Sequence, residues 1–314
     1  MVNGSMTPTP GEGLGLTIRQ PLEDRSRRIG DGVSLQAQRT SRDSFKVASL
    51  NIRGRVCTAQ GYRQDKWFEL NRVINTHRIA VLAVQETHLT DELAASFETA
   101  FGSRLKLFHS PLQETRNAAG VAIVINKGLI NANEIKCTTL IPGRALLVEI
   151  PWHAGSKIKV LDVYAPNDAK ENEIFWEKID EITSDDPALK PDIMLGDCNL
   201  VEDSLDRLPC HPDNPNAVAS LGILKGNLDL VDGWRRTFPD RREYSHTHAP
   251  NASQGRIDRI YITNALLSPA CDWKIDSTTI ETDHWMVSVN VSSPEAPLIG
   301  KGRWQIPKIG RAHV

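Results

Sequence analysis

Divalent-metal chemistry is the first function that the polar residues of this sequence could support. Oxygen-bearing side chains recur at the ends of short apolar segments: Asn51 in LNIRG, Glu86 in VQETHL, Asp197 and Asn199 in LGDCNL, and Asp283 in ETDHW. Carboxylate and amide oxygens are hard ligands that suit Mg²⁺ or Mn²⁺ better than zinc. One such residue alone is usually a capping or turn residue, whereas five at strand ends on one rim favour a single metal site.

His284, next to Asp283, could do acid–base or electrostatic work at a phosphate group. An unperturbed imidazole titrates near ~6.5, so a neighbouring carboxylate can hold it in the required tautomer or charge state. Asp258, in the segment RIDRIY, is the expected orienting partner from an adjacent strand. By contrast, His246 and His248, in YSHTHAP, are expected at a turn or on the surface.

Tyr164, in the segment VYAPN, has a phenol that could hydrogen-bond to a phosphate oxygen, and Asn167 helps to shape the turn that carries it. The alternative is a tyrosine that covers the core at a strand end. Basic residues could also contact phosphate, and the cluster from Arg235 to Arg242, which includes Arg236, is the best candidate. For each arginine alone, a solvated positive face is the alternative.

The segments between these motifs predict a sheet-rich fold with fewer helices. Nine runs rich in apolar and β-branched residues predict strands: FKVASL, IAVLAV, LKLFHS, GVAIVI, ALLVEI, KIKVLDVY, DIMLG, RIYIT and WMVSVNV. Four segments predict helices, at Tyr62 to His77, Asp91 to Phe101, Asn172 to Ile182 and Asn216 to Gly222. We therefore expect an α+β fold with two sheets packed face to face and helices outside them.

Charge and cysteine usage narrow the class of protein. A net charge of -2 argues against whole-protein attraction to nucleic acid, so any such partner is held by a local surface. Five widely spaced cysteines without a CxxC pair predict neither a disulfide framework nor a zinc site. No apolar run is long enough to span a bilayer. We expect a soluble, intracellular protein that makes no membrane contact.

The sequence divides into three expected regions: a disordered tail at 1–44, one large domain at 45–293, and a linker or tail at 294–314. The first region has few large apolar residues with which to offset the entropy of ordering. The last is rich in Pro and Gly. Its final residues, KIGRAHV, match one reading frame of a common sequencing-adapter sequence, so we expect the natural protein to continue past Pro307.

In their order along the chain, LNIRG, QETHL, VYAPN, GDCN, RID and TDH resemble the motif series of the endonuclease/exonuclease/phosphatase superfamily. The resemblance is to the exonuclease III and apurinic endonuclease branch, particularly the endonuclease domains of LINE-type (non-LTR) retrotransposons. It covers about Phe45 to Val291. It implies a DNase I-like, four-layer α/β/β/α sandwich and a metal-dependent hydrolase that uses Mg²⁺ or Mn²⁺.

The resemblance also implies a role for each matched residue. Asp197 would position or deprotonate the attacking water, and Asn199 would stabilise the transition state. His284, oriented by Asp258, would bind the phosphate as charge develops. Tyr164 would contact the scissile phosphate. The implied metal-site residues are Asn51, Glu86, Asp197, Asn199, Asp283 and His284, with Glu86 the principal ligand, and the candidate substrate-binding residues are Asn167, Arg235 and Arg236.

Three departures from the family pattern refine the expected function. Arg53 stands two residues after Asn51, where many relatives carry Asp or Asn. Asp162 replaces an Asn often found two residues before Tyr164. The segment YSHTHAP lacks the aromatic residues that pack around an extrahelical sugar in dedicated abasic-site enzymes. We therefore expect nicking of ordinary DNA, not abasic-site repair, as the main role.

The expected function is that of a Mg²⁺-dependent DNA endonuclease that nicks DNA as in non-LTR retrotransposons. We expect a monomer, located in the nucleus, whose full-length form carries a C-terminal reverse transcriptase after the basic linker GKGRW. One alternative is a phosphatase or phosphodiesterase of the same fold that acts on another phosphate ester. The other is a catalytically decayed nucleic-acid-binding remnant, against which the intact metal and Asp-His positions argue.

Overall fold

The computed structural model describes residues 44–54, 56–57, 64–111, 120–152, 155–248 and 252–293, all within one compact unit that spans Gln38–Val314. The tail predicted at 1–44, apart from Ser44, lies outside the described residues. The linker predicted at 294–314 also lies outside them, so the predictions for these two segments stay predictions.

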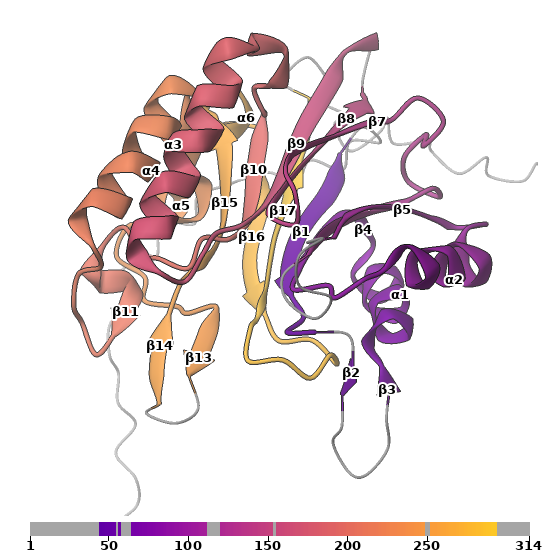
Figure 1. Cartoon of the computed structure of the whole chain (residues 1–314), viewed down its shortest axis with the longest axis horizontal. Coiled ribbons are helices and arrows are strands. Elements are labelled where there is room, and N and C mark those ends of the chain that lie inside the picture. The colour runs from indigo at the N-terminus through magenta and orange to yellow at the C-terminus, as the bar shows by residue number, and fades with distance from the viewer. Residues whose placement is uncertain are drawn as a thin grey trace, which may run out of the picture. The chain divides into compact units, whose positions relative to one another are not determined.

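Two six-stranded sheets lie face to face at the centre of the described domain (Figure 1). The first has the strand order β16 (Cys271–Asp276), β17 (Met286–Val291), β1 (Phe45–Asn51), β4 (Ile79–Gln85), β6 (Val121–Asn126) and β5 (Leu105–Ser110). The second has the order β12 (Leu230–Asp232), β15 (Asp258–Thr263), β10 (Ile193–Asp197), β9 (Lys157–Tyr164), β8 (Ala145–Pro151) and β7 (Lys136–Ile141). In both sheets the central pair, β1 with β4 and β9 with β10, is parallel.

Helices cover the outer face of each sheet (Figure 1). Those on the first sheet are α1 (Lys66–His77) and α2 (Asp91–Phe101), and those on the second are α3 (Ala169–Asp185) and α4 (Pro215–Asn227). The shorter described elements are α5 (Gly233–Thr237), α6 (Asn264–Leu267), β2 (Val56–Cys57), β3 (Gln64–Asp65), β11 (Arg207–Leu208), β13 (His246–His248), β14 (Ser253–Gly255) and two 3-10 turns, Pro187–Leu189 and Ser204–Asp206. Among the described helices, none has the length and apolar character needed to cross a bilayer.

Period-two alternation along the strands fills three apolar layers. Val81 and Leu195 point inward and pack in the layer between the sheets. Their neighbours Leu82 and Met194 point outward, where they pack in the layers beneath the helices. The four-layer α/β/β/α sandwich and the α+β class predicted from the sequence are confirmed.

The nine predicted strands are observed as β1, β4, β5, β6, β8, β9, β10, β15 and β17. Of the strands in these two sheets, the prediction missed three edge strands, β7, β12 and β16: β7 is largely exposed, β12 has only three residues, and in β16 only Trp273 and Ile275 are buried. The helix predicted from Tyr62 begins at Lys66, because the Asp65 side chain accepts the backbone N–H of Trp67 and caps it there.

Candidate active site

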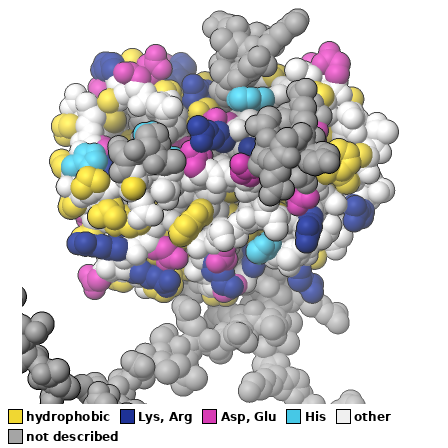
Figure 2. All heavy atoms as spheres, turned by 90° about the horizontal axis from the view of Figure 1, so that it is seen from below, with side chains coloured by type: hydrophobic (Ala, Val, Ile, Leu, Met, Phe, Trp, Pro, Cys, Tyr) yellow, Lys and Arg dark blue, Asp and Glu magenta, His cyan; other side chains and the backbone are white. Residues whose placement is uncertain are grey.

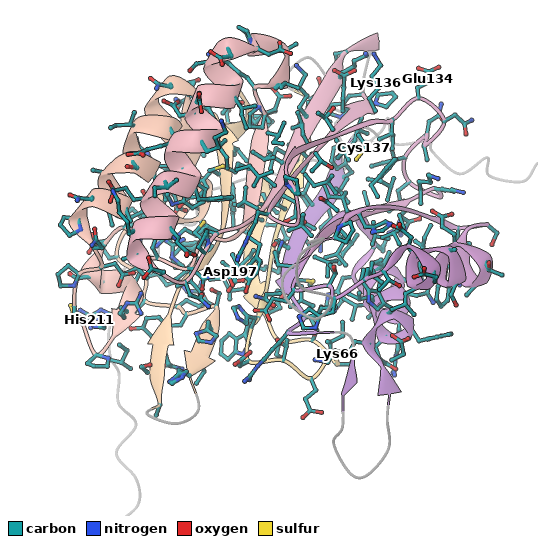
Figure 3. The ribbon with its side chains drawn as sticks, viewed as in Figure 1. Lys66, Glu134, Lys136, Cys137, Asp197 and His211 are labelled. Carbon is teal, nitrogen blue, oxygen red and sulfur yellow. The ribbon has the colours of Figure 1, made fainter. Side chains whose placement is uncertain are left out.

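The residues predicted to form the site converge at one edge of the two sheets, which we call the site edge; Asp197 is labelled there in Figure 3. Asn51 ends β1, Tyr164 ends β9 and Asp197 ends β10. Asp258 begins β15, which is antiparallel to β10 and places Asp258 opposite Asp197. A strand end and the start of its antiparallel neighbour share an edge, which explains the convergence. Figure 2, the view from below, shows acidic, basic and histidine side chains close together.

Asn51 joins two carboxylates that lie far apart in the sequence. Its Nδ2 donates to Glu86 Oε1 at 3.0 Å and to Asp197 Oδ2 at 2.9 Å. Its Oδ1 accepts the backbone N–H of Arg53 at 2.9 Å, and this contact sets the orientation of the amide. Because the nitrogen faces the carboxylates, the geometry favours a positioning role for Asn51 over its predicted role as a metal ligand.

Tight turns hold Glu86 and Asn199 at the site edge. Their backbone φ angles are +50° and +49°, in the left-handed region. The backbone N–H of Asn199 donates to Asp197 Oδ1 at 2.9 Å, and its Nδ2 donates to the Ala165 carbonyl at 2.8 Å. Gly196 is needed before Asp197, because a Cβ there would lie 1.9 Å from a carbonyl oxygen of β9. The LGDCN segment is thus packed closely on β9 and aims Asp197 between the sheets.

A second polar contact joins the two sheets beside the carboxylates. Gln85 Nε2 of β4 donates to Asp162 Oδ1 of β9 at 2.6 Å and to Ser49 Oγ at 3.0 Å. Burial raises the pKa of Asp162 well above its usual range, although the Gln85 hydrogen bond opposes the rise. Asp162, which departs from the family pattern, therefore joins the two sheets through a carboxyl group whose ionisation is disfavoured by burial.

His284 lies in a buried hydrogen-bond network. Its Nδ1 is 2.9 Å from Asp258 Oδ2, and Ser245 Oγ donates to the same oxygen at 2.7 Å. Its other ring nitrogen, Nε2, is 3.9 Å from Asp197 Oδ2 and 4.0 Å from Asp283 Oδ1. The predicted contact between His284 and Asp258 is confirmed, but it joins the two sheets and not adjacent strands of one sheet, because β15 and β17 belong to different sheets. It leaves Nε2 facing the carboxylates of the site.

Burial and three carboxylates decide the charge of His284. Burial alone would lower its pKa, but Asp258, Asp197 and Asp283 together outweigh burial and raise the pKa to about 9. Burial, followed by the charge of Asp258, raises the pKa of Asp197 to about 6. At neutral pH the histidine is therefore an imidazolium with a proton on each nitrogen. Because Asp258 occupies Nδ1 and the surrounding carboxylates favour a proton on Nε2, the arrangement favours an electrostatic role for His284 over its predicted role as a metal ligand.

Asp283 lies at the mouth of the site. Its Oδ2 accepts a 2.7 Å hydrogen bond from Arg53 Nη1 and is 3.7 Å from His246 Nε2. The ring of His246 packs on that of His284, with 4.5 Å between centroids. Burial would raise the pKa of Asp283, but contacts with His246, His284 and Arg53 lower it to about 2. Asp283 is therefore an ionised carboxylate surrounded by cationic and imidazole groups.

Tyr164 is buried beside the carboxylates, as its position in VYAPN predicted. Burial raises the pKa of its phenol well above the usual value, and the charges of Glu86 and Asp197 add to the rise. The Arg144 guanidinium lies 4.7 Å from the ring centroid and donates to the Tyr164 carbonyl at 3.2 Å. Tyr164 therefore stays a neutral hydroxyl, which can donate a hydrogen bond.

The predicted substrate-binding residues divide into two kinds. Asn167, before α3, and Arg236, on α5, are exposed. Arg235 is instead committed within the protein: its Nη1 donates to three backbone carbonyls in the segment Phe238–Arg241 at 2.8 to 3.2 Å, and its Nη2 contacts Asp206. The substrate-binding prediction for Arg235 is therefore corrected, because its guanidinium holds the chain that follows α5.

Sequence reasoning missed Ser245 and His246, two residues of the segment YSHTHAP. The Ser245 hydroxyl donates to the carboxylate of Asp258 and accepts its backbone N–H at 2.9 Å. The prediction of a turn or surface position for His246 was wrong, since it forms a β-bridge with His284 at the site edge. The hairpin of β13 and β14 makes this return possible. The only sequence signal for this hairpin is the Pro-Asn pair between two polar segments. Those segments have no alternating apolar pattern that would have predicted strands.

Glu86 and Asp197 are the pair best suited to a hard divalent cation. Their oxygens converge on one amide nitrogen, and Mg²⁺ binds to few carboxylates while keeping several waters. Among the described residues, two groups of three side chains are compact enough to hold a metal, and both include His284: Asp197 with Asp258 and His284, and His246 with Asp283 and His284. Both groups include a histidine nitrogen, whereas Glu86 and Asp197 offer only the oxygen ligands that Mg²⁺ prefers.

Sequence comparison supports the same family. Residues 48–284 match the model of the Endonuclease/Exonuclease/phosphatase family. The Transposon TX1 uncharacterized 149 kDa protein of Xenopus laevis is 30% identical over 265 residues, which cover 81% of this chain and 19% of that protein. The chain therefore spans about a fifth of the length of this curated relative.

Solved structures with the same fold include several nucleases. The AP endonuclease LMAP from Leishmania major has a TM-score of 0.66 at 17% identity, with coverage of 80% of this chain and 89% of that one. The endonuclease domain of TRAS1, a telomere-specific non-LTR retrotransposon, has a TM-score of 0.55 at 19% identity, with coverage of 79% and 98%. At these identities the structures show a shared fold, while the match over residues 48–284 establishes descent. The chain belongs to the Endonuclease/Exonuclease/phosphatase family.

Proposed function

We propose that the protein is a Mg²⁺-dependent endonuclease that nicks DNA, as in non-LTR retrotransposons. The observation that carries the proposal is the position of His284 Nε2, 3.9 Å from Asp197, on a histidine whose other nitrogen contacts Asp258. Metal-binding carboxylates and a phosphate-binding cation thus lie side by side, which is what hydrolysis of a phosphodiester requires. The transposon relative and the TRAS1 domain support DNA as the substrate.

Asp197 and His284 would act on different oxygens at the reacting phosphorus. Asp197, ionised at neutral pH, would orient the attacking water and accept its proton as the bond from phosphorus to the leaving oxygen breaks. His284, with a pKa of about 9, would donate its Nε2–H to a non-bridging phosphate oxygen as negative charge grows there. Asp258 keeps this imidazolium oriented through Nδ1.

Neighbouring groups would complete the binding of the phosphate. The neutral hydroxyl of Tyr164 can donate a hydrogen bond to a second phosphate oxygen. Asn199, held by its contacts with Asp197 and the Ala165 carbonyl, keeps the water-activating carboxylate in place. Mg²⁺, bound by Glu86 and Asp197, would supply Lewis-acid stabilisation of the charge that develops on the phosphate.

Nicking of supercoiled plasmid tests the proposal. Wild-type protein should nick in Mg²⁺ and lose the activity in EDTA, and Glu86→Gln and His284→Ala should each lower the rate on the order of 10²-fold or more. Glu173→Ala, on the outer helix α3, is the matched control and should nick normally. Full activity in both site variants would refute the assignment. DNA binding without any cleavage would identify a decayed remnant, and hydrolysis of another phosphate ester alone would identify a different substrate.

The chain matches 19% of the 149 kDa TX1 protein. We also propose that it is part of a longer polypeptide that continues into a reverse transcriptase, and that this polypeptide works in the nucleus. Sequencing of transcripts from the locus past Pro307 tests the first point. Imaging of the tagged full-length product tests the second, and a stop codon directly after Val314 would contradict the first.

A further inference from the structure

Arg53 is a cation built into the mouth of the site, where it follows Asn51 by two residues. Its Nη1 donates to Asp283 Oδ2 at 2.7 Å, and its side chain is 67% exposed. Asp283 in turn lies beside His284, with 4.0 Å between Asp283 Oδ1 and His284 Nε2. One carboxylate group therefore separates an exposed guanidinium from the imidazolium that would bind the scissile phosphate.

The backbone holds Arg53 firmly in this place. Its φ angle is +48°, and its N–H donates to Asn51 Oδ1 at 2.9 Å. Its carbonyl lies 3.4 Å from the ammonium of the buried Lys66, which also binds the Ile52 carbonyl at 2.7 Å. The loop is tied to the Asp283 segment as well, because Thr282 Oγ1 donates to the Asn51 carbonyl at 2.9 Å. The backbone from which the Arg53 side chain extends is thus held in place.

The ion pair between Arg53 and Asp283 is not explained by a contribution to the stability of the fold. An ion pair with an exposed partner adds little to stability, because solvent screens it and ordering the side chains costs entropy. A guanidinium, however, carries five N–H donors in a planar fork, and the bond to Asp283 uses one edge of Arg53. The remaining donors are accessible, since two thirds of the side chain is exposed. They suit a bidentate contact with a phosphate.

We propose that Arg53, held by Asp283, binds the DNA backbone phosphate next to the scissile one and so positions the strand in the site. This inference rests on the proposed nuclease function and deepens it. Arg53 acts as a substrate-positioning residue: its contact is with a phosphate that does not react. The contact carries no base information, so it is equally available on any DNA sequence.

Metal-free DNA binding tests the contact without relying on turnover. Fluorescence anisotropy in EDTA, over a series of KCl concentrations, gives the dissociation constant and its salt dependence. Arg53→Ala should weaken binding about tenfold at low salt and reduce the slope of log K against log[KCl] by about 1, as expected for one lost phosphate contact. Arg53→Lys should restore the slope but only part of the affinity, because an ammonium cannot bind bidentately.

Arg104→Ala is the matched control. Arg104 is an exposed arginine that precedes β5, and Leu105 pairs with Asn126 at the end of β6, away from the site edge. This variant should keep both the affinity and the salt slope of the wild type. An equal loss of slope in Arg104→Ala and Arg53→Ala would show a non-specific charge effect and overturn the proposal.

Neutral phosphates locate the contact. Once the nick is mapped, substrates with a methylphosphonate at each flanking position should show one adjacent site that weakens wild-type binding. Arg53→Ala should be insensitive to that same substitution, because the partner is already missing. Unchanged sensitivity in Arg53→Ala would overturn the proposal while leaving nuclease activity intact. Absence of nicking by wild type would instead show that the underlying nuclease assignment had failed.

Discussion

His284 Nδ1 lies 2.9 Å from Asp258 Oδ2, and this buried contact is the main cause that raises the pKa of the histidine to about 9 against the effect of burial. The opposite nitrogen of the ring faces Asp197, which burial makes a weaker acid than an ordinary aspartate. Two groups of opposite charge, with pKa values of about 6 and about 9, therefore face the same point. Pairs of titratable groups whose environments separate their pKa values are a pattern found in acid–base catalysis.

The first prediction is a bell-shaped pH dependence of kcat/KM for nicking. Activity should rise as Asp197 loses its proton and fall as pH passes through about 9, where His284 loses its proton. The acid limb should lie at or below about 6 and move to lower pH as Mg²⁺ is raised, because a nearby cation favours the carboxylate. A rate that stays constant from pH 7 to beyond pH 10 would contradict the role of His284.

The second prediction concerns Asp258 and Ser245, which lie next to His284 in the hydrogen-bond network. Variants of these two residues should shift the basic limb of the pH profile in opposite directions. Asp258→Asn removes the charge that holds the imidazolium, so its basic limb should move toward lower pH, with a loss in kcat on the order of 10²-fold. Ser245→Ala removes a hydrogen bond that stabilises the Asp258 charge. With that hydrogen bond gone, Asp258 should accept the Nδ1–H of His284 more strongly, which should move the basic limb to higher pH. Shifts in the same direction would disprove this network.

The third prediction concerns Asn51, whose single nitrogen bonds to both Glu86 and Asp197. Asn51→Asp places a third carboxylate between them, so the metal-free protein should lose stability through like-charge repulsion. Mg²⁺ should relieve that repulsion, and the rise in melting temperature on adding Mg²⁺ should be larger in this variant than in the wild type. Differential scanning fluorimetry with Asn51→Leu, which adds no charge, is the control. Equal Mg²⁺ responses in both variants would contradict the assigned cation site.

The main strands and the meeting of polar residues at the site edge were predictable because they follow local patterns. Alternating apolar residues in β4 and β10 fix which side chains face the space between the sheets, and Asp197 inherits that direction. Asp258 and His284 could be paired because each stands at the start of a recognisable strand. The orientation of the Asn51 amide could not be read in the same way, since it depends on an Arg53 backbone contact that only the folded turn creates.

The errors have a common physical origin in contacts between polar residues distant in sequence. Ser245 and His246 come from a polar segment, so nothing in its hydrophobic pattern indicates that it returns to the site edge. Arg235 was mistaken for a free cation because its partner, Asp206, lies 29 residues earlier in the chain. Charge alone did not distinguish a buried network from an exposed binding face.

The last prediction tests that network, in which Asp206 binds two buried arginines. Its carboxylate accepts from Arg256 Nε and Nη2 at 2.8 Å and from Arg259 Nη2 at 3.1 Å, and both arginine side chains are at most 2% exposed. Asp206→Ala leaves these cations short of a partner and should cost about 3–5 kcal/mol in the free energy of unfolding, measured with urea. Glu181→Ala, which removes an exposed partner of Lys178, should leave that free energy unchanged within error.

The pH dependence of the free energy of unfolding shows whether the charge of Asp206 stabilises the fold. Burial would raise the pKa of Asp206, but its arginine partners outweigh burial and hold the pKa below its usual value. A carboxylate with a lowered pKa stabilises the fold above its unfolded pKa of ~4 and loses that contribution as pH falls through its folded value. The stability gap between wild type and Asp206→Ala should therefore be full at pH 7 and narrow toward pH 3. A gap that is constant with pH would mean that packing, not charge, is what Asp206 supplies.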